Sequence, residues 1–186
     1  MSEAGTEIVS ESTYTDERGF EIKEGLDEHQ NRVLLEVRGE GSFFSVPDGI
    51  YALAKDAFSE VTESMCCVFI PKSVKVVPAY TFGDFRGEFK FTIDGKEPRE
   101  LTILCEADRR PEGFYVEVCA DTFQEDYEFY TECHYRTWCG YSIRTGKSED
   151  GLGSGDIVSY GLDLPHVHWG VSAQESLKYC ETGVPR

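Results

Sequence analysis

The sequence predicts a mainly β protein with short helices, built as a short stack of repeated units that β-hairpins cap at the edges. Two observations carry this prediction. One pattern of apolar residues and proline occurs twice, in residues 45–58 and in residues 69–82, at a constant offset of 24. A period between about 20 and 50 residues is the signature of stacked repeats. Runs of alternating apolar and polar residues flank the two copies, as expected for half-buried strands.

Each copy reads as a short strand that ends at a proline, then a turn, a second apolar segment and a short helical turn closed by phenylalanine. Proline lacks a backbone donor, so it suits the end of a strand. The offset places Phe58 on Phe82, and we expect both rings to be buried in one column of the core. Six positions match: Val46 with Ile70, Pro47 with Pro71, Ile50 with Val74, Leu53 with Val77, Ala57 with Thr81 and Phe58 with Phe82.

These two copies resemble the BspA-like leucine-rich repeats of bacterial and protist proteins, whose units read approximately I-P-x-x-V-x-x-I-x-x-x-A-F. The resemblance covers residues 45–58 and 69–82 and no more of the chain. It implies a short right-handed leucine-rich-repeat-like solenoid with a role in interaction. It carries over no catalytic residue, because the family pattern contains none.

A degraded third copy is expected to begin with "LTILC" at residues 101–105 and to end with "YVEVCADTF" at residues 115–123. In that copy Val118 and Phe123 would take the roles of Val77 and Phe82. The intervening "EADRRPEG" makes this copy about eight residues longer than the other two, so its stacking is expected to be less regular.

Two further elements are expected after the second copy of the repeat. A hairpin is expected to pair residues 89–93 with residues 100–104, because Asp94-Gly95 is a hairpin turn signal. A helix is expected over residues 172–180, where Ser172 and Glu175 have the spacing of a capping box. Together these patterns divide the chain into four regions: a flexible acidic N-terminus (1–18), a capping hairpin (19–42), the repeat array with its inserted hairpin (43–128) and a β-rich C-terminal extension with the terminal helix (129–186).

The charge is strongly acidic, with 35 Asp and Glu against 18 Lys and Arg and a net charge of −17. Acidic residues dominate residues 1–60 and 111–186, whereas residues 61–110 are balanced. This surplus either serves solubility alone or steers the protein toward a basic partner. Direct binding to nucleic acid or to an anionic membrane is disfavoured, because both need a cluster of Lys and Arg. The polar, acidic N-terminus does not read as a signal peptide, so a cytoplasmic location is expected.

The cysteines are expected to be reduced thiols in the core, because their number is odd, two are adjacent and no export signal is evident. A metal site built from Cys133, Cys139, His166 and His168 can be imagined, but their spacing matches no common zinc pattern. We therefore predict no metal and no cofactor. The seven cysteines are Cys66, Cys67, Cys105, Cys119, Cys133, Cys139 and Cys180.

The segment "TFQEDYEFYTE", residues 122–132, is the candidate binding site. It alternates acids with aromatic side chains, a combination that suits a basic protein surface. The alternative interpretation is an ordinary amphipathic strand with its acids in solvent. The candidate residues are Glu125, Asp126, Tyr127, Glu128, Phe129, Tyr130 and Glu132.

The function expected from these features is that of a non-enzymatic protein–protein interaction module whose acidic surface docks on a basic partner. One alternative is an acidic inhibitor, of phage or mobile-element origin, that mimics nucleic acid toward a nucleic-acid-binding enzyme. A second alternative is a small Cys/His metal or thiol enzyme. Clustered carboxylates on one face would favour the inhibitor, and a cleft that holds His with Cys or Asp would favour the enzyme.

Overall fold

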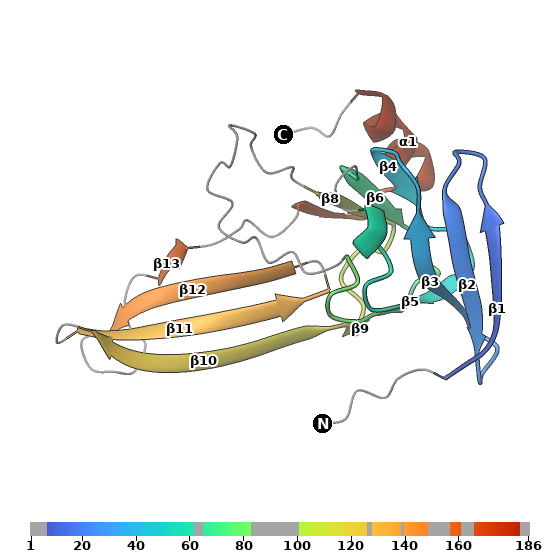
Figure 1. Cartoon of the computed structure of the whole chain (residues 1–186). Helices are drawn as coiled ribbons and strands as arrows, with labels where there is room; N and C mark the ends of the chain where they lie inside the picture. The colour runs from blue at the N-terminus through green and yellow to red at the C-terminus, as the bar shows by residue number, and fades with distance from the viewer. Residues whose placement is uncertain are drawn as a thin grey trace.

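The computed structural model describes residues 7–61, 65–82, 101–125, 128–138, 140–148, 157–160 and 166–182. Within these residues the protein is mainly β, with one α-helix and one short 3-10 helix (Figure 1). The elements are β1 (Ile8–Thr15), β2 (Glu21–Asp27), β3 (Arg32–Arg38), β4 (Phe43–Ser45), β5 (Ile50–Leu53), η1 (Ser59–Val61), β6 (Cys67–Ile70), β7 (Val76–Val77), β8 (Thr102–Cys105), β9 (Gly113–Phe114), β10 (Val116–Glu125), β11 (Glu128–Thr137), β12 (Gly140–Ser148), β13 (Ile157–Tyr160), β14 (His166–Trp169) and α1 (Ala173–Thr182).

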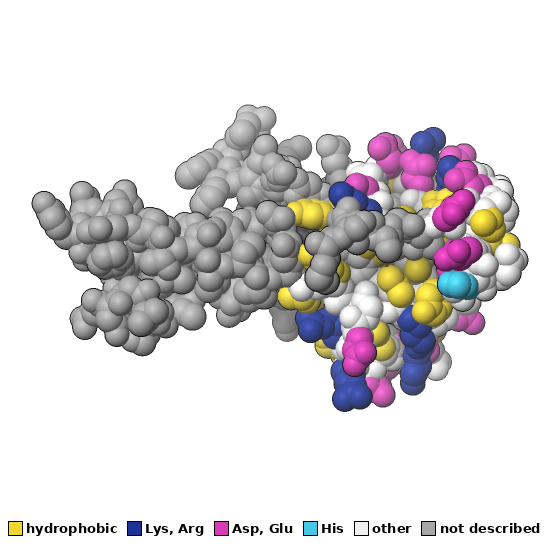
Figure 2. All heavy atoms as spheres, turned by 90° about the horizontal axis from the view of Figure 1, so that it is seen from below, with side chains coloured by type: hydrophobic (Ala, Val, Ile, Leu, Met, Phe, Trp, Pro, Cys, Tyr) yellow, Lys and Arg dark blue, Asp and Glu magenta, His cyan; other side chains and the backbone are white. Residues whose placement is uncertain are grey.

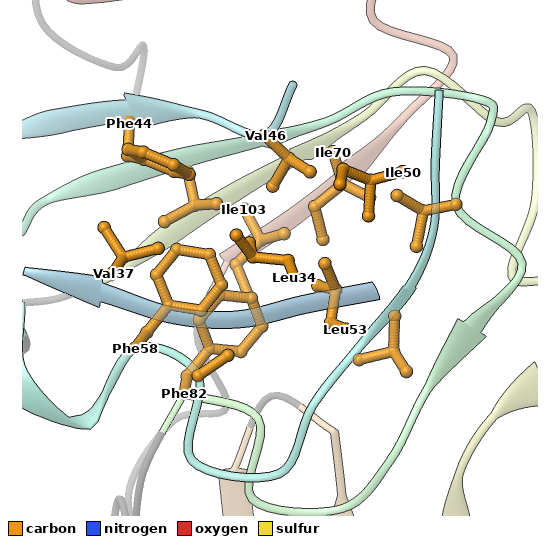
Figure 3. Close-up of a cluster of buried hydrophobic side chains, with 14 of the residues drawn as sticks. Leu34, Val37, Phe44, Val46, Ile50, Leu53, Phe58, Ile70, Phe82 and Ile103 are labelled. Atoms are coloured by element: carbon orange, nitrogen blue, oxygen red, sulfur yellow. The ribbon is translucent and has the colours of Figure 1, made fainter. Parts of the chain in front are cut away.

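These strands form three sheets. A six-stranded sheet has the order β1-β2-β3-β5-β7-β9, and a four-stranded sheet has the order β14-β8-β6-β4. The main core lies between these two sheets, because strands of both contribute buried apolar side chains to it (Figure 3). The third sheet, β10-β11-β12-β13, is antiparallel and extends away from the other two (Figure 1).

The 24-residue offset is confirmed in the strand pairing. Strand β4 pairs in parallel with β6, with Ser45 opposite Phe69, and β5 pairs in parallel with β7, with Ala52 opposite Val76. The loops repeat as well: Asp56 and Tyr80 have positive φ angles of 59° and 62°. The amide of Asp56 donates to the carbonyl of Tyr80 over 3.0 Å. The two copies therefore lie as consecutive layers with the same local backbone.

The turn after each proline also repeats. The amide of Ile50 donates to the carbonyl of Pro47 over 3.3 Å, and that of Val74 donates to Pro71 over 3.1 Å. A third turn of this kind lies between Pro111 and Phe114, with a distance of 3.1 Å. Each turn connects a strand of the four-stranded parallel sheet to a strand of the six-stranded sheet, so proline marks the point at which the chain changes sheet.

Phe58 and Phe82 are both buried, and their rings stack at 4.8 Å between centroids with an interplanar angle of 23° (Figure 3). The prediction of one buried column is confirmed. The column also continues on both sides: Phe44 lies 5.5 Å from Phe58, and Trp138 lies 6.0 Å from Phe82. Aromatic contact therefore runs through successive layers of the core.

The prediction for the third copy is right for its first strand and wrong for its second. Strand β8 pairs in parallel with β6, as expected. The second strand is β9, where Phe114 lies opposite Val77. Val118 and Phe123 belong instead to β10 of the antiparallel sheet. The turn that ends at Phe114 closes the long insertion and starts the second strand at once, so residues after 115 leave the stack.

The N-terminal region differs from the expected flexible tail, because residues 8–15 form β1, antiparallel to β2. The β-branched residues of "IVSESTYT" favour a strand. A turn fixes the connection: the Asp16 carboxylate accepts from the amides of Arg18 and Phe20, and Gly19 has a φ of 90°. Within residues 19–42, β2 and β3 form an antiparallel hairpin, as expected.

The predicted inserted hairpin does not agree with the described neighbours of β8. Strand β8 lies between β6 and β14, and both pair with it in parallel over residues 102–105. An antiparallel partner therefore has no edge to occupy there, and residues 89–93 lie outside the described residues. In the C-terminal region, β11 to β14 and α1 agree with the expected β-rich extension and terminal helix.

The terminal helix covers the outer face of the parallel four-stranded sheet, where it lies against β6. Its capping box is confirmed, because the Ser172 amide donates to Glu175 Oε2 over 3.0 Å and the Glu175 amide donates to Ser172 Oγ over 3.3 Å. The Ser172 hydroxyl also donates to Glu175 Oε2, over 2.7 Å, and the bonds from the Ser172 hydroxyl and amide lower the pKa of Glu175. The face beside this helix carries a second, smaller group of buried residues, namely Phe43, Cys67, Phe69, Leu104 and Val171.

Candidate functional site

The predicted binding segment spans the end of β10 and the beginning of β11, at the end of this hairpin that lies far from the packed sheets (Figure 1). It is therefore not a single amphipathic strand. Asp126 and Tyr127 lie outside the described residues. The other five candidate residues occupy known positions in the strand register, and that register decides which of them share a face of the sheet.

The register brings acidic and aromatic positions together in rows. Glu125 is paired with Glu128, and Asp121 is paired with Glu132. Between these two rows Phe123 is paired with Tyr130. Paired positions of an antiparallel sheet, and positions two apart along a strand, belong to one face. One face of the hairpin therefore carries an acidic row, an aromatic row and a second acidic row. We call these six positions the acidic–aromatic face.

Two corrections to the predicted site follow from this register. Phe129 is paired with Gln124, at positions on the opposite face from Glu125 and Glu128. Asp121 and Phe123 belong to the acidic–aromatic face although they were not among the predicted residues. The sequence offers a signal for them only after the strand pairing is known, because they lie across the hairpin from Glu132 and Tyr130.

The electrostatics of this face are unusual for a sheet. Like charges directly opposite each other on neighbouring strands destabilise the pairing. Here two such acidic pairs occur on the same face of one hairpin, Glu125 with Glu128 and Asp121 with Glu132. On the next strand Lys147 is paired with Tyr130, which places one cationic position beside the aromatic row.

The part of the protein formed by the other two sheets does not share this pattern. On the face that Figure 2 shows, acidic and basic side chains of the described residues are interspersed with hydrophobic ones. Several of these acids have a basic partner: Glu11 lies 2.7 Å from Lys23, and Glu36 lies 2.8 Å from Arg38. The charge of the core is therefore partly balanced locally, as is usual for a solvated surface.

A second polar cluster joins the capping hairpin to the first repeat turn. Glu24 is buried, and its carboxylate accepts hydrogen bonds from Arg32 Nε at 3.0 Å and Nη2 at 2.7 Å. The Tyr14 hydroxyl donates to Glu24 Oε1 over 2.5 Å, and Arg32 Nη1 donates to the Asp48 carbonyl over 2.9 Å. Partial burial and the bond to Glu24 raise the pKa of Tyr14 to about 12. Sequence reasoning missed this cluster, because its members come from three strands and a turn.

The imagined Cys/His site is spread over the structure. Cys133 and His134 are adjacent on β11, so their positions belong to opposite faces of the sheet. His166 and His168 occupy one face of β14, which lies in a different sheet. Cys139 is outside the described residues. In the part of the chain that the structure describes, no group of three His, Cys, Asp or Glu side chains is placed to hold a metal ion.

Three of the cysteines can be placed as thiols. Cys67 and Cys105 are buried, and Cys66, which directly precedes Cys67 in the chain, is half-buried. Burial among apolar side chains is the usual position of a structural cysteine. The reduced state of the remaining four cysteines stays a prediction.

A scan against protein-family models, a search of curated proteins and a search of solved structures each gave no match. Among the described helices none is long and apolar enough to cross a membrane.

Proposed function

We propose that the protein is a non-enzymatic interaction module, cytoplasmic in location, that docks on a protein with a basic surface through the acidic–aromatic face. The observation that supports this most is the register of β10 and β11, which opposes Glu125 to Glu128 and Asp121 to Glu132. Such pairs cost stability in isolation, and a bound cationic surface would turn that repulsion into attraction. The aromatic row between them offers the kind of anchor that dominates interface energetics.

The spacing of the acids favours a protein partner over mimicry of nucleic acid. Asp121 and Glu125 are four positions apart on one strand, which corresponds to about 13 Å. Phosphates along one strand of duplex DNA follow each other every 3.4 Å or so along the helix axis. An acidic row, an aromatic row and a second acidic row do not reproduce that dense ladder. They match a surface whose cations flank an apolar or aromatic contact.

We further propose that the parallel strands form a short right-handed solenoid of the leucine-rich-repeat type, which serves as the scaffold. The support is the repetition at several levels: the strand register at an offset of 24, the turns that follow Pro47 and Pro71, and the positive φ angles of Asp56 and Tyr80. Repeats of this kind commonly carry interaction surfaces rather than catalytic groups.

The docking proposal is tested with fluorescent oligolysine and oligoarginine peptides as probes and the full chain as the binding protein. The double variant Glu125→Lys with Glu128→Lys should abolish binding. The control variant Glu17→Lys with Glu40→Lys makes the same change of net charge at two exposed acids outside the β10–β11 hairpin. It should retain most of the binding. Equal losses in both variants would show attraction to net charge only, and would contradict the proposal.

The aromatic row is tested separately. Phe123→Ser with Tyr130→Ser leaves the charge unchanged, so any loss of affinity reports contact with the rings. We expect the aromatic variant to bind more weakly than the wild type, and this difference in affinity should persist at high salt concentration. The electrostatic part of the affinity should fall in both proteins, because salt screens it over about 8 Å at physiological ionic strength. Peptide affinity that is unaffected by the aromatic variant would restrict the site to charge.

A further inference from the structure

Strand β1 forms an open edge of the six-stranded sheet (Figure 1). Among the described residues it pairs with β2 alone, and seven of its eight residues are exposed. Edge strands present a row of unpaired backbone donors and acceptors, and proteins usually protect them with proline, lysine or a very short strand. The sequence "IVSESTYT" has no proline and no lysine, and the one irregularity of its ladder is a register shift between Ile8 and Ser10, which leaves residues 10–15 in regular pairing. Its one charged residue, Glu11, is paired with Lys23 at 2.7 Å.

We propose that β1 pairs antiparallel with β1 of a second copy of the chain, in a register centred on Ser12. The pairing joins the two six-stranded sheets into one continuous sheet and makes a two-fold dimer. This inference goes beyond the proposed docking function and does not depend on it, because β1 and the β10–β11 hairpin belong to different sheets.

Symmetry limits the possible registers. A two-fold axis perpendicular to the joined sheet relates β1 of one copy to β1 of the other and keeps each face of the sheet on the same side. One residue of β1 must then lie opposite the same residue of the second copy. A register centred on Glu11 would oppose two carboxylates, which is unfavourable. One centred on Thr13 would extend the ladder into Asp16, whose backbone and carboxylate are engaged in the turn with Phe20. The register centred on Ser12 opposes no two carboxylates and pairs residues 9–15 of the two strands with one another, so that only the terminal Ile8 faces Asp16.

That register is chemically self-complementary. It places Ser12 opposite the partner's Ser12, Glu11 opposite the partner's Thr13, and Ser10 opposite the partner's Tyr14. Each pair contains a hydroxyl group, which can donate or accept a hydrogen bond. Cross-strand hydroxyl pairs stabilise sheets. No pair opposes like charges.

The strand also carries apolar surface that a partner would cover. Val9 is 55% exposed and Tyr14 is 39% exposed, and both belong to the few exposed large hydrophobic residues of the described chain. The net charge of −17 opposes association of two copies. Because salt screens that repulsion, dimerisation should strengthen as the salt concentration rises. Docking on a basic partner has the opposite dependence, so the two interactions can be distinguished.

Sedimentation of the full chain from low micromolar to millimolar concentration tests the proposal, and we expect a reversible monomer–dimer equilibrium. Thr13→Glu opposes a second carboxylate to the partner's Glu11, and should weaken the dimer by about tenfold. Thr13→Gln should change the dissociation constant by less than about twofold. Thr15→Glu adds the same charge opposite the partner's Val9, so its effect should be smaller than that of Thr13→Glu. A monomer at every concentration, or equal effects of the two Glu variants, would overturn the proposal.

A cross-link tests the register itself. In the register centred on Ser12, the Cα atoms of the two Ser12 residues lie about 5 Å apart, within the range of a disulfide. Those of the two Ser10 residues lie about 13 Å apart. Under mild oxidation Ser12→Cys should form a covalent dimer well above the wild-type background, and Ser10→Cys should not. Cross-linking of Ser12→Cys no faster than Ser10→Cys would reject this register and the proposed dimer with it.

Discussion

Phe58 and Phe82 stack at 4.8 Å between ring centroids although they are 24 positions apart in the sequence. The contact is nearly parallel, whereas Phe44 meets Phe58 edge to face at an interplanar angle of 74°. Equivalent residues of consecutive layers thus adopt the same orientation, and the neighbours outside the repeat do not. Each of the two repeat layers thus contributes one ring of this stacked pair to the core.

Truncation of Phe82 tests the energetic weight of the column. Phe82→Ala should destabilise the protein by roughly 3 to 5 kcal/mol, because it removes a fully buried ring in contact with Phe58 and Trp138. Phe82→Leu keeps much of the apolar volume and should cost clearly less. The measurement is the free energy of unfolding in urea. Similar costs for the two variants would contradict a packing role of the ring.

Tyr80 provides a test of the repeated loop. It has a φ of 62°, a region that bulky residues rarely occupy, where the first copy has Asp56. Tyr80→Gly should remove backbone strain of about 1 kcal/mol, offset by the lost contact between the ring and Lys55 Nζ at 5.6 Å. Its stability should equal or exceed that of the wild type. Ala54→Gly, at a residue without positive φ, should destabilise by about 0.5 to 1 kcal/mol. Equal destabilisation by both glycines would argue against strain at Tyr80.

Tyr14 gives the capping hairpin a dependence on alkaline pH. Its pKa is raised from 10.0 to about 12 in the folded protein. The neutral hydroxyl that donates to Glu24 is therefore favoured by folding, and its contribution to stability is complete below pH 10. That contribution is lost as the pH rises through the interval up to about 12.

The measurement compares the wild type with Tyr14→Phe. The difference between their free energies of unfolding should shrink as the pH rises from about 10 to about 12. Tyr51, another exposed tyrosine, serves as the matched control in Tyr51→Phe. A difference between wild type and Tyr14→Phe that stays constant over this interval would show that the hydrogen bond to Glu24 does not stabilise the fold.

The sequence predicted the layers that local signals specify. Proline ends each strand of the four-stranded parallel sheet in the repeats, and apolar positions recur at the same offset, so two layers and the Phe58–Phe82 contact follow from residues 45–82. The first strand of the third layer was predicted as well, but the aromatic packing of that layer could not be predicted in this way. Its aromatic side chain, Trp138, returns from the far end of the β10–β11 hairpin to pack between Phe82 and Phe114. That contact depends on chain geometry that no local pattern encodes.

The candidate site shows the same limit. The composition of residues 122–132 indicates a binding surface, but the face that each residue occupies depends on the pairing of two strands. A shift of the register by one position moves every side chain to the other face. For this reason Phe129 was grouped with Glu128, and Asp121 was missed. The ion pair of the buried Glu24 with the partly exposed Arg32 was missed because a charged residue in a strand normally indicates the solvent face.

Insertion of a further repeat tests the scaffold as a whole. Duplicating residues 46–69 in tandem adds one 24-residue unit with its own proline, apolar positions and phenylalanine. If the layers are equivalent, the inserted unit should stack between the existing two and add one parallel strand to each of the two sheets, since each repeat contacts only its neighbours. The variant should then gain β signal in circular dichroism, and its urea transition should remain cooperative with a larger m-value, because more surface is exposed on unfolding. A scrambled 24-residue insert of identical composition serves as the control and should unfold like a loop insertion, with an unchanged m-value. A tandem variant that behaves like the scrambled one, or that fails to fold while the scrambled one folds, would contradict the equivalence of the layers and the proposed solenoid.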